Sequence, residues 1–129
     1  MHKVTMLELP TPLGTTLWVS EKASKEMSRF FRRNDPKKAF RKALFRGMEN
    51  GFQALIGTKV VSEGNGIFRF GIEDSLFRLI GFFNNGYNEF IVIETLEKSG
   101  QKLSRPNMDC INRVAKVKEK SQWFKENDE

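Results

Sequence analysis

Three consecutive strand-like segments in the middle of the chain constrain its fold most. Residues 67–72, 76–83 and 89–96 are rich in aromatic and β-branched side chains and are separated by turn-forming residues. The second connection, Asn84-Asn85-Gly86, is a strong signal for a tight hairpin. The pattern predicts a three-stranded antiparallel meander.

The first hairpin of this meander has a specific expected register. A two-residue turn at Glu73-Asp74 places Arg69 directly opposite Arg78, and alternation along the strands turns both away from the core. The expected core face holds Phe68, Phe70, Ile72, Phe77, Leu79 and Phe83. Two neighbouring guanidinium groups repel each other unless an anion such as phosphate lies between them. Alternatively, each arginine holds a carboxylate such as Glu89 or Glu94.

Helices are expected on both sides of the meander in the sequence. Residues 1–18 are predicted to be extended, and Ser20 is a good N-cap for a helix over 20–33. Pro36 is suited to start a second helix that ends near Gly51, and Pro106 to start a last one. The expected apolar positions are Ala23, Met27, Phe30 and Phe31 in the first helix, Ala39, Phe40, Ala43, Leu44 and Met48 in the second, and Met108, Ile111, Val114 and Ala115 in the last.

These elements predict one α+β domain over residues 1–129. Its antiparallel twisted sheet carries an N-terminal helical hairpin and a C-terminal helix, with the helices packed on one face.

Scarce cysteine and histidine exclude several kinds of chemistry. Cys110 is the only cysteine, which rules out an internal disulfide, and His2 is the only histidine, expected in a mobile terminus. A zinc site and histidine-based nucleophilic catalysis therefore lack their residues, and no metal or other cofactor is expected. Without an apolar run of membrane-spanning length or a signal-peptide core, we expect a soluble, cytoplasmic protein.

Positive charge is concentrated in the first half of the chain. The net charge is +6, and the segment between Arg29 and Arg46 holds eight basic residues against one acid, Asp35. Such a block is typical of a surface that binds polyphosphate or an acidic partner. It is equally typical of a solvated helix surface.

Two segments resemble RelE/HigB-type toxins of toxin–antitoxin systems. Residues 68–80 (FRFGIEDSLFRLI) resemble the central hairpin of these toxins, in which an aromatic-basic strand leads to an aromatic-Arg-aliphatic strand. Residues 96–106 (LEKSGQKLSRP) resemble the basic segment after the last strand in phage-derived HigB-like relatives. The resemblance covers about residues 55–120 and agrees with the helical hairpin before it.

The resemblance implies a metal-independent endoribonuclease that cleaves mRNA, usually on the ribosome, and so inhibits translation. It assigns Arg78 to transition-state stabilisation, Arg69 to holding the phosphate and Lys98 to a further basic position, with Lys102 as a nearby phosphate contact or proton-transfer group. Expected partners are mRNA, the ribosome and a cognate antitoxin, either a helix-turn-helix or a small acidic protein. The basic helices would contact RNA or the antitoxin through Arg32, Arg33, Arg41, Lys42 and Arg46.

The chain also departs from the family pattern. Gly71 stands where RelE has a second strand lysine, and no C-terminal tyrosine is present to stack on a base, since the only tyrosine is Tyr87 in a turn. Trp123 and Phe124 are late aromatics, typical of helix packing and also able to stack on bases. The general base remains unassigned.

Two other functions compete with the ribonuclease. A ParE-like toxin would keep the fold but poison DNA gyrase through protein contacts. A non-catalytic accessory protein of a mobile element would bind nucleic acid without cutting it. The trio Arg69, Arg78 and Lys98 favours the ribonuclease, because a gyrase poison needs no phosphate-binding group there.

Overall fold

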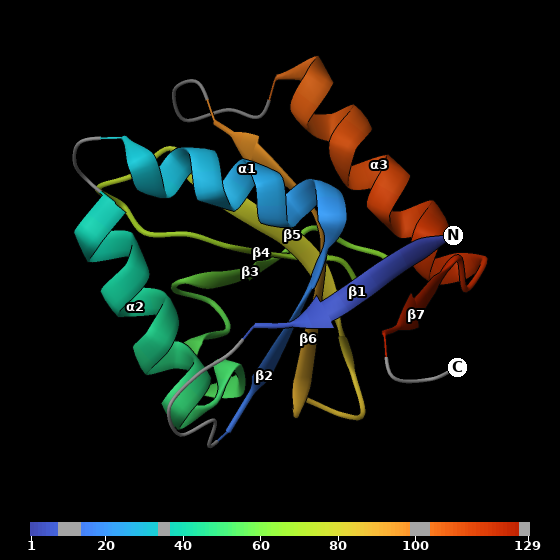
Figure 1. Cartoon of the computed structure of the whole chain (residues 1–129), viewed down its shortest axis with the longest axis horizontal. Helices are drawn as coiled ribbons and strands as arrows, with labels where there is room; N and C mark the ends of the chain where they lie inside the picture. Colours follow the sequence, from blue (N-terminus) through green and yellow to red (C-terminus); the bar gives the residue numbers. More distant parts are fainter. Residues whose placement is uncertain (8–13, 34–36, 99–103, 127–129) are drawn as a thin grey trace.

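The computed structural model is an α+β fold in which one seven-stranded sheet lies between helices (Figure 1). It describes residues 1–7, 14–33, 37–98 and 104–126. The elements are β1 (His2–Met6), β2 (Thr16–Ser20), α1 (Glu21–Arg32), α2 (Lys37–Asn50), the 3₁₀ helix η1 (Phe52–Leu55), β3 (Val60–Ser62), β4 (Phe68–Phe70), β5 (Phe77–Asn84), β6 (Glu89–Glu97), α3 (Arg105–Glu119) and β7 (Trp123–Lys125). The strand order is β3-β4-β5-β6-β2-β1-β7.

The meander predicted from the sequence forms the middle of this sheet. Strands β4, β5 and β6 pair antiparallel in chain order, and β5 and β6 turn through Asn85 and Gly86, which both have positive φ. The prediction of a wholly antiparallel sheet is wrong, because β2 pairs in parallel with β6 and β1 in parallel with β7. Parallel neighbours need a long crossover, and residues 21–88 supply it between β2 and β6.

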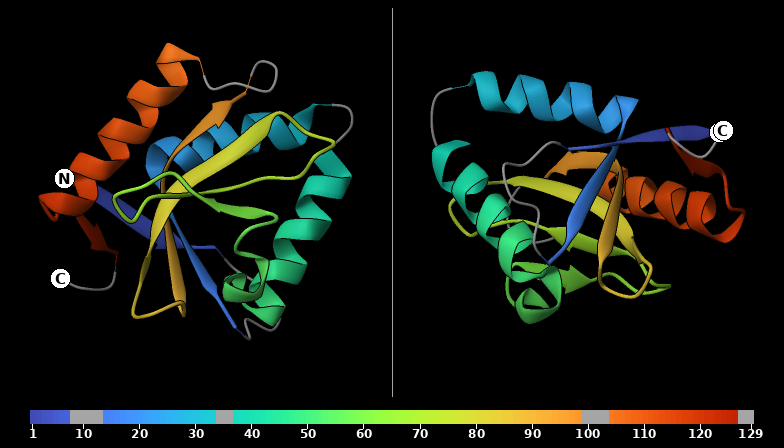
Figure 2. Two further views of the ribbon diagram at one scale, coloured as in Figure 1. Left: turned by 180° about the vertical axis from the view of Figure 1, so that it is seen from behind. Right: turned by 60° about the horizontal axis from the view of Figure 1, so that its bottom comes forward.

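Helices cover both faces of the sheet. Helices α1 and α2 lie on one face and α3 on the other (Figure 2), so the prediction that all helices pack on one face is wrong. The reason is visible in β6, where Phe90 and Val92 point to one core while Ile91 and Ile93 point to the other. A strand that is apolar on both faces has to be covered on both.

The first two helices do not form the expected antiparallel hairpin. Figure 1 shows them running in different directions, and they meet near the Phe30–Phe40 ring pair, whose centroids are 5.2 Å apart. Ser20 caps α1 as predicted, by accepting the Ala23 amide at 3.1 Å. Each helix packs its apolar stripe onto the sheet instead of onto the other helix.

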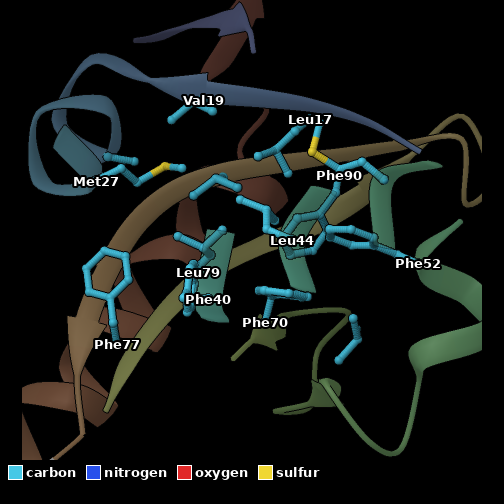
Figure 3. Close-up of a cluster of buried hydrophobic side chains, with 14 of the residues drawn as sticks. Leu17, Val19, Met27, Phe40, Leu44, Phe52, Phe70, Phe77, Leu79 and Phe90 are labelled. Atoms are coloured by element: carbon cyan, nitrogen blue, oxygen red, sulfur yellow. The ribbon is translucent and has the colours of Figure 1, made fainter. Parts of the chain in front are cut away.

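Aromatic side chains dominate the core under α1 and α2 (Figure 3). Phe30 stacks on Phe77 at 4.2 Å, and Phe52 stacks on Phe70 at 5.3 Å. Phe70, Phe77 and Leu79 share this face, which confirms the predicted grouping of the hairpin side chains. In the α2 stripe, Phe40, Leu44 and Met48 are buried, whereas Ala43 is half-buried and Ala39 is exposed.

The core under α3 is mainly aliphatic. Ile111 and Val114 are buried as predicted, but Met108 is 54% exposed, and Cys110 and Val117 fill the remaining helix positions. The helix begins at Arg105, one residue before the predicted start at Pro106, and Ser104 caps it.

After α3 the chain forms strand β7, which the sequence did not predict. His2 is not in a mobile terminus but in β1, where it pairs with Trp123 of β7. Trp123 packs its ring on Phe82 at 5.5 Å. Backbone pairing thus anchors both ends of the described chain.

Candidate active site

Arg69 and Arg78 lie on the same face of the sheet, as predicted, but not directly opposite each other. Arg69 is paired with Ile80, and Arg78 with Leu96 on β6. Ile80 and Leu96 belong to the α3-side core, so both arginines face that side. The predicted register was wrong by two residues, because the β4–β5 connection is longer than a two-residue turn. A shift of two preserves which face each side chain takes.

The backbone of the β4–β5 connection fixes the Arg78 side chain. Its Nη1 donates to the carbonyl of Phe77 at 2.8 Å and also to the carbonyl of Ser75. The side chain lies against Gly71, where a Cβ would come within 2.2 Å of Arg78 Cδ. Arg78 is therefore half-buried and not freely exposed, and Gly71 provides the space that it occupies.

Arg69 is paired with Glu63, which follows β3. The Arg69 Nε lies 2.7 Å from Glu63 Oε1, and both side chains are mostly buried. Neither Glu89 nor Glu94, the alternatives raised by the sequence, is the partner. Arg69 Nη1 is buried without a hydrogen-bond partner. A buried guanidinium N–H without an acceptor is costly.

Lys98 completes a cluster of three cations. Its backbone amide donates to the carbonyl of Leu76 at 2.8 Å, which fixes the end of β6 beside the β4–β5 connection. Burial and the positive charges of Arg69 and Arg78 lower the pKa of Lys98, against an opposing effect of Glu63. Burial and Arg69 likewise lower the pKa of Arg78. Mutual repulsion of this kind is relieved when an anion binds.

Two residues in or beside this cluster were not predicted from the sequence. Glu63 was interpreted only as part of the turn Glu63-Gly64-Asn65-Gly66, because nothing in its local pattern links it to Arg69. Lys118 of α3 reaches the same turn, with its Nζ 2.9 Å from where a Cβ at Gly66 would lie. The glycines of the turn were the available signal, since close approach of a side chain to backbone favours glycine.

The basic residues of α1 and α2 are not part of this cluster. Both helices cover the opposite face of the sheet, where Arg32, Arg41, Lys42 and Arg46 are exposed. Arg33 pairs with Glu97, next to Lys98 at the end of β6. Arg41 lies 4.9 Å above the ring of Phe31. Lys102 falls outside the described residues.

Two buried carboxylates of β6 already have partners. Glu94 accepts from Arg113 at 2.8 and 2.9 Å and from Lys22 at 2.8 Å. Glu89 accepts from Trp18 and Lys125, both at 2.8 Å. Within the described ranges, no three His, Cys, Asp or Glu side chains are grouped as metal ligands. No described helix is long and apolar enough to span a membrane.

Comparisons with protein-family models, with curated proteins and with solved structures found no match. The chemistry of this site therefore has to be inferred from its own residues.

Proposed function

We propose that the chain is a metal-independent endoribonuclease of the RelE/HigB toxin type, which cleaves mRNA at the site formed by Arg69, Arg78, Lys98 and Glu63. The observation that carries the proposal is the gathering of three cations and one carboxylate from β3, β4, β5 and β6.

The arginines would bind the phosphate that is cut. Arg69 would attract the phosphate through its positive charge, because it lies on the same face of the sheet as Arg78. Arg78, held by two backbone carbonyls, would present the rest of its guanidinium without losing side-chain entropy. Pre-oriented donors stabilise developing negative charge efficiently.

Glu63 and Lys98 would transfer the protons. The ribose 2′-oxygen attacks phosphorus while its proton passes to the Glu63 carboxylate. The bond between phosphorus and O5′ breaks, its electron pair stays with O5′, and Lys98 donates a proton to that oxygen. The products are a 2′,3′-cyclic phosphate and a 5′-hydroxyl end. The lowered pKa of Lys98 makes its ammonium a stronger acid.

The first test uses a 5′-labelled RNA of mixed sequence in EDTA, free and as mRNA on translating ribosomes. We expect cleavage with cyclic-phosphate ends, reduced about 10²–10³-fold by Arg78→Ala and less by Arg69→Ala. Glu63→Gln should cost about 10²-fold or more. Arg29→Ala, an exposed arginine on α1, is the control and should cut normally.

The pH profile separates the two proton-transfer roles. Because the pKa of Lys98 lies below the ordinary 10.5, activity should fall on the alkaline side at a pH below 10.5. Lys98→Ala should remove this alkaline limb. Folded Arg78→Ala protein that cuts as fast as the parent would refute the site. RNA binding without cleavage in either assay would favour the non-catalytic accessory protein instead.

Expression of the chain without a partner gives the cellular test. We expect growth arrest and new mRNA 5′ ends with the parent protein, and neither with Arg78→Ala. Arrest with intact mRNA and damaged DNA would favour the gyrase-poisoning alternative.

A further inference from the structure

A hollow of about 380 Å³ lies between α2, η1 and the start of β3, on the face of the sheet away from the Arg78 cluster. Its α2 wall has a stripe of small residues, Ala39, Ala43 and Gly47, spaced four apart. Leu55 and Ala54 form the opposite wall. The volume is at the low end of the range for enclosed ligands, so it can take a few side chains but not a whole helix.

Small side chains on α2 create this space. Gly47 marks where η1 comes closest, because a Cβ there would lie 2.9 Å from Leu55 Cδ1. At Ala43 and Ala39 themselves, the side chain is only a methyl group. The larger apolar residues of α2, including Phe40 and Leu44, point instead into the aromatic core. The sequence did not separate these two sets, because both follow helical spacing.

Cations line the same hollow. Lys42, Arg46 and Lys59 belong to its lining, which contains no acidic residue, and within the described part of the chain no carboxylate forms an ion pair with them. The three cations share the lining with the apolar side chains of Ala39, Ala43, Ala54 and Leu55. Nucleic acid would use the charges and leave these apolar side chains uncovered. An acidic amphipathic helix would use both features, because its apolar side chains enter the hollow and its carboxylates meet the cations.

We propose that this hollow, lined by Ala39, Lys42, Ala43, Arg46, Ala54, Leu55 and Lys59, is the docking site for an acidic amphipathic helix of a partner protein. The small-residue stripe lets such a helix approach α2 closely, and the cations fix its position through charge. This inference is independent of RNA cleavage, because it involves other residues, most of them on α2 and η1.

A designed peptide tests the site directly. The probe is a 16-residue fluorescein-labelled helix with Leu and Ala along one face and Glu along both borders of that face. A scrambled peptide of the same composition is its control. We expect the patterned peptide to bind at least tenfold more tightly than the scrambled one, and binding to weaken with added salt.

Variants identify the surface. Ala39→Phe and Ala54→Phe fill the hollow from opposite walls and should each weaken binding about tenfold, while Arg46→Glu should weaken it further. Arg29→Glu, outside the hollow, should bind like the parent. Ala39 and Ala54 are both exposed, so thermal unfolding should remain normal for these variants.

Two outcomes would overturn the proposal. Equal binding of patterned and scrambled peptides would mean that charge alone attracts them. Displacement of the peptide by a short RNA, together with no effect of Ala39→Phe and Ala54→Phe, would assign the surface to nucleic acid.

Discussion

The two faces of the sheet solve the problem of burial in different ways. The face under α1 and α2 is filled by stacked aromatic rings, and the only described carboxylate oxygen buried there without a partner is Oε1 of Glu26 on α1. The face under α3 is mainly aliphatic and holds two buried carboxylates, Glu89 and Glu94, each with basic partners. The proposed active site is also on this second face.

The contrast concerns where a site for proton transfer can form: the proposed site lies on the face that holds buried charges. An aromatic core is stabilised by dispersion and ring geometry, which need no water and no charge. The α3 side has to balance desolvated charges against one another, and its groups have shifted pKa values. Burial, for example, raises the pKa of Cys110 to about 12. A site that binds and transfers protons requires such an environment.

The largest expected loss of stability comes from a substitution that forces β5 and β6 apart. These two strands carry side chains of both cores. A Cβ at Gly81 would lie 1.9 Å from the carbonyl oxygen of Ile91, which is backbone and cannot move aside. We expect Gly81→Ala to cost about 3 kcal/mol or more in the free energy of unfolding, measured by urea denaturation. Gly71→Ala, which meets the Arg78 side chain and no backbone atom among its three nearest contacts, should cost less. Equal losses would show that the strands can separate locally.

The next largest effect is a pH-dependent loss of stability, expected only on the α3 side, where Glu94 is buried. Burial raises the pKa of Glu94, but the bonds from Arg113 and Lys22 outweigh it, so the pKa lies below the ordinary 4.5. Its contribution to stability is therefore complete above pH 4.5 and lost as the pH falls further through the folded-state value. We expect Glu94→Gln to cost about 2 kcal/mol at pH 7.

That cost should shrink below pH 4.5, where the parent carboxylate also becomes protonated. Glu119→Gln, exposed on α3, is the matched control and should change little at any pH. A cost for Glu94→Gln that stays constant down to pH 3 would contradict the role of its charge.

The smallest expected effect is the difference in stability loss between the same Phe→Leu substitution on the two faces. Phe70 contacts two rings, Phe52 at 5.3 Å and Phe40 at 5.5 Å, whereas Phe82 contacts Trp123 at 5.5 Å. Since an aromatic pair contributes about 0.5–1.5 kcal/mol beyond burial, Phe70→Leu should cost about 1 kcal/mol more than Phe82→Leu. Chemical denaturation of both variants measures the difference. A larger loss at Phe82 would mean that the aromatic face does not depend on its ring contacts.

The candidate site could be predicted only in part from the sequence. Alternation within the hairpin was enough to place Arg69 and Arg78 on one face, since a register error of two leaves the facing unchanged. The bonds of Arg78 to the carbonyls of Ser75 and Phe77 depend on the path of the connection, which residue types alone do not encode. Glu63 is six residues from Arg69, and only the pairing of β3 with β4 brings the two together.

The sequence by itself determined the central meander and the ends of two helices, but not η1, β3 or β7. Its turn and cap residues placed the Asn85-Gly86 hairpin and, to within one residue, the starts of the helices near Ser20 and Pro106, because those signals act over only a few residues. Only the tertiary structure decided that α3 takes the opposite face, that β2 joins β6 in parallel, and that α1 and α2 diverge. These outcomes depend on which apolar surfaces remain uncovered when all elements assemble, and that competition is settled between segments far apart in the chain.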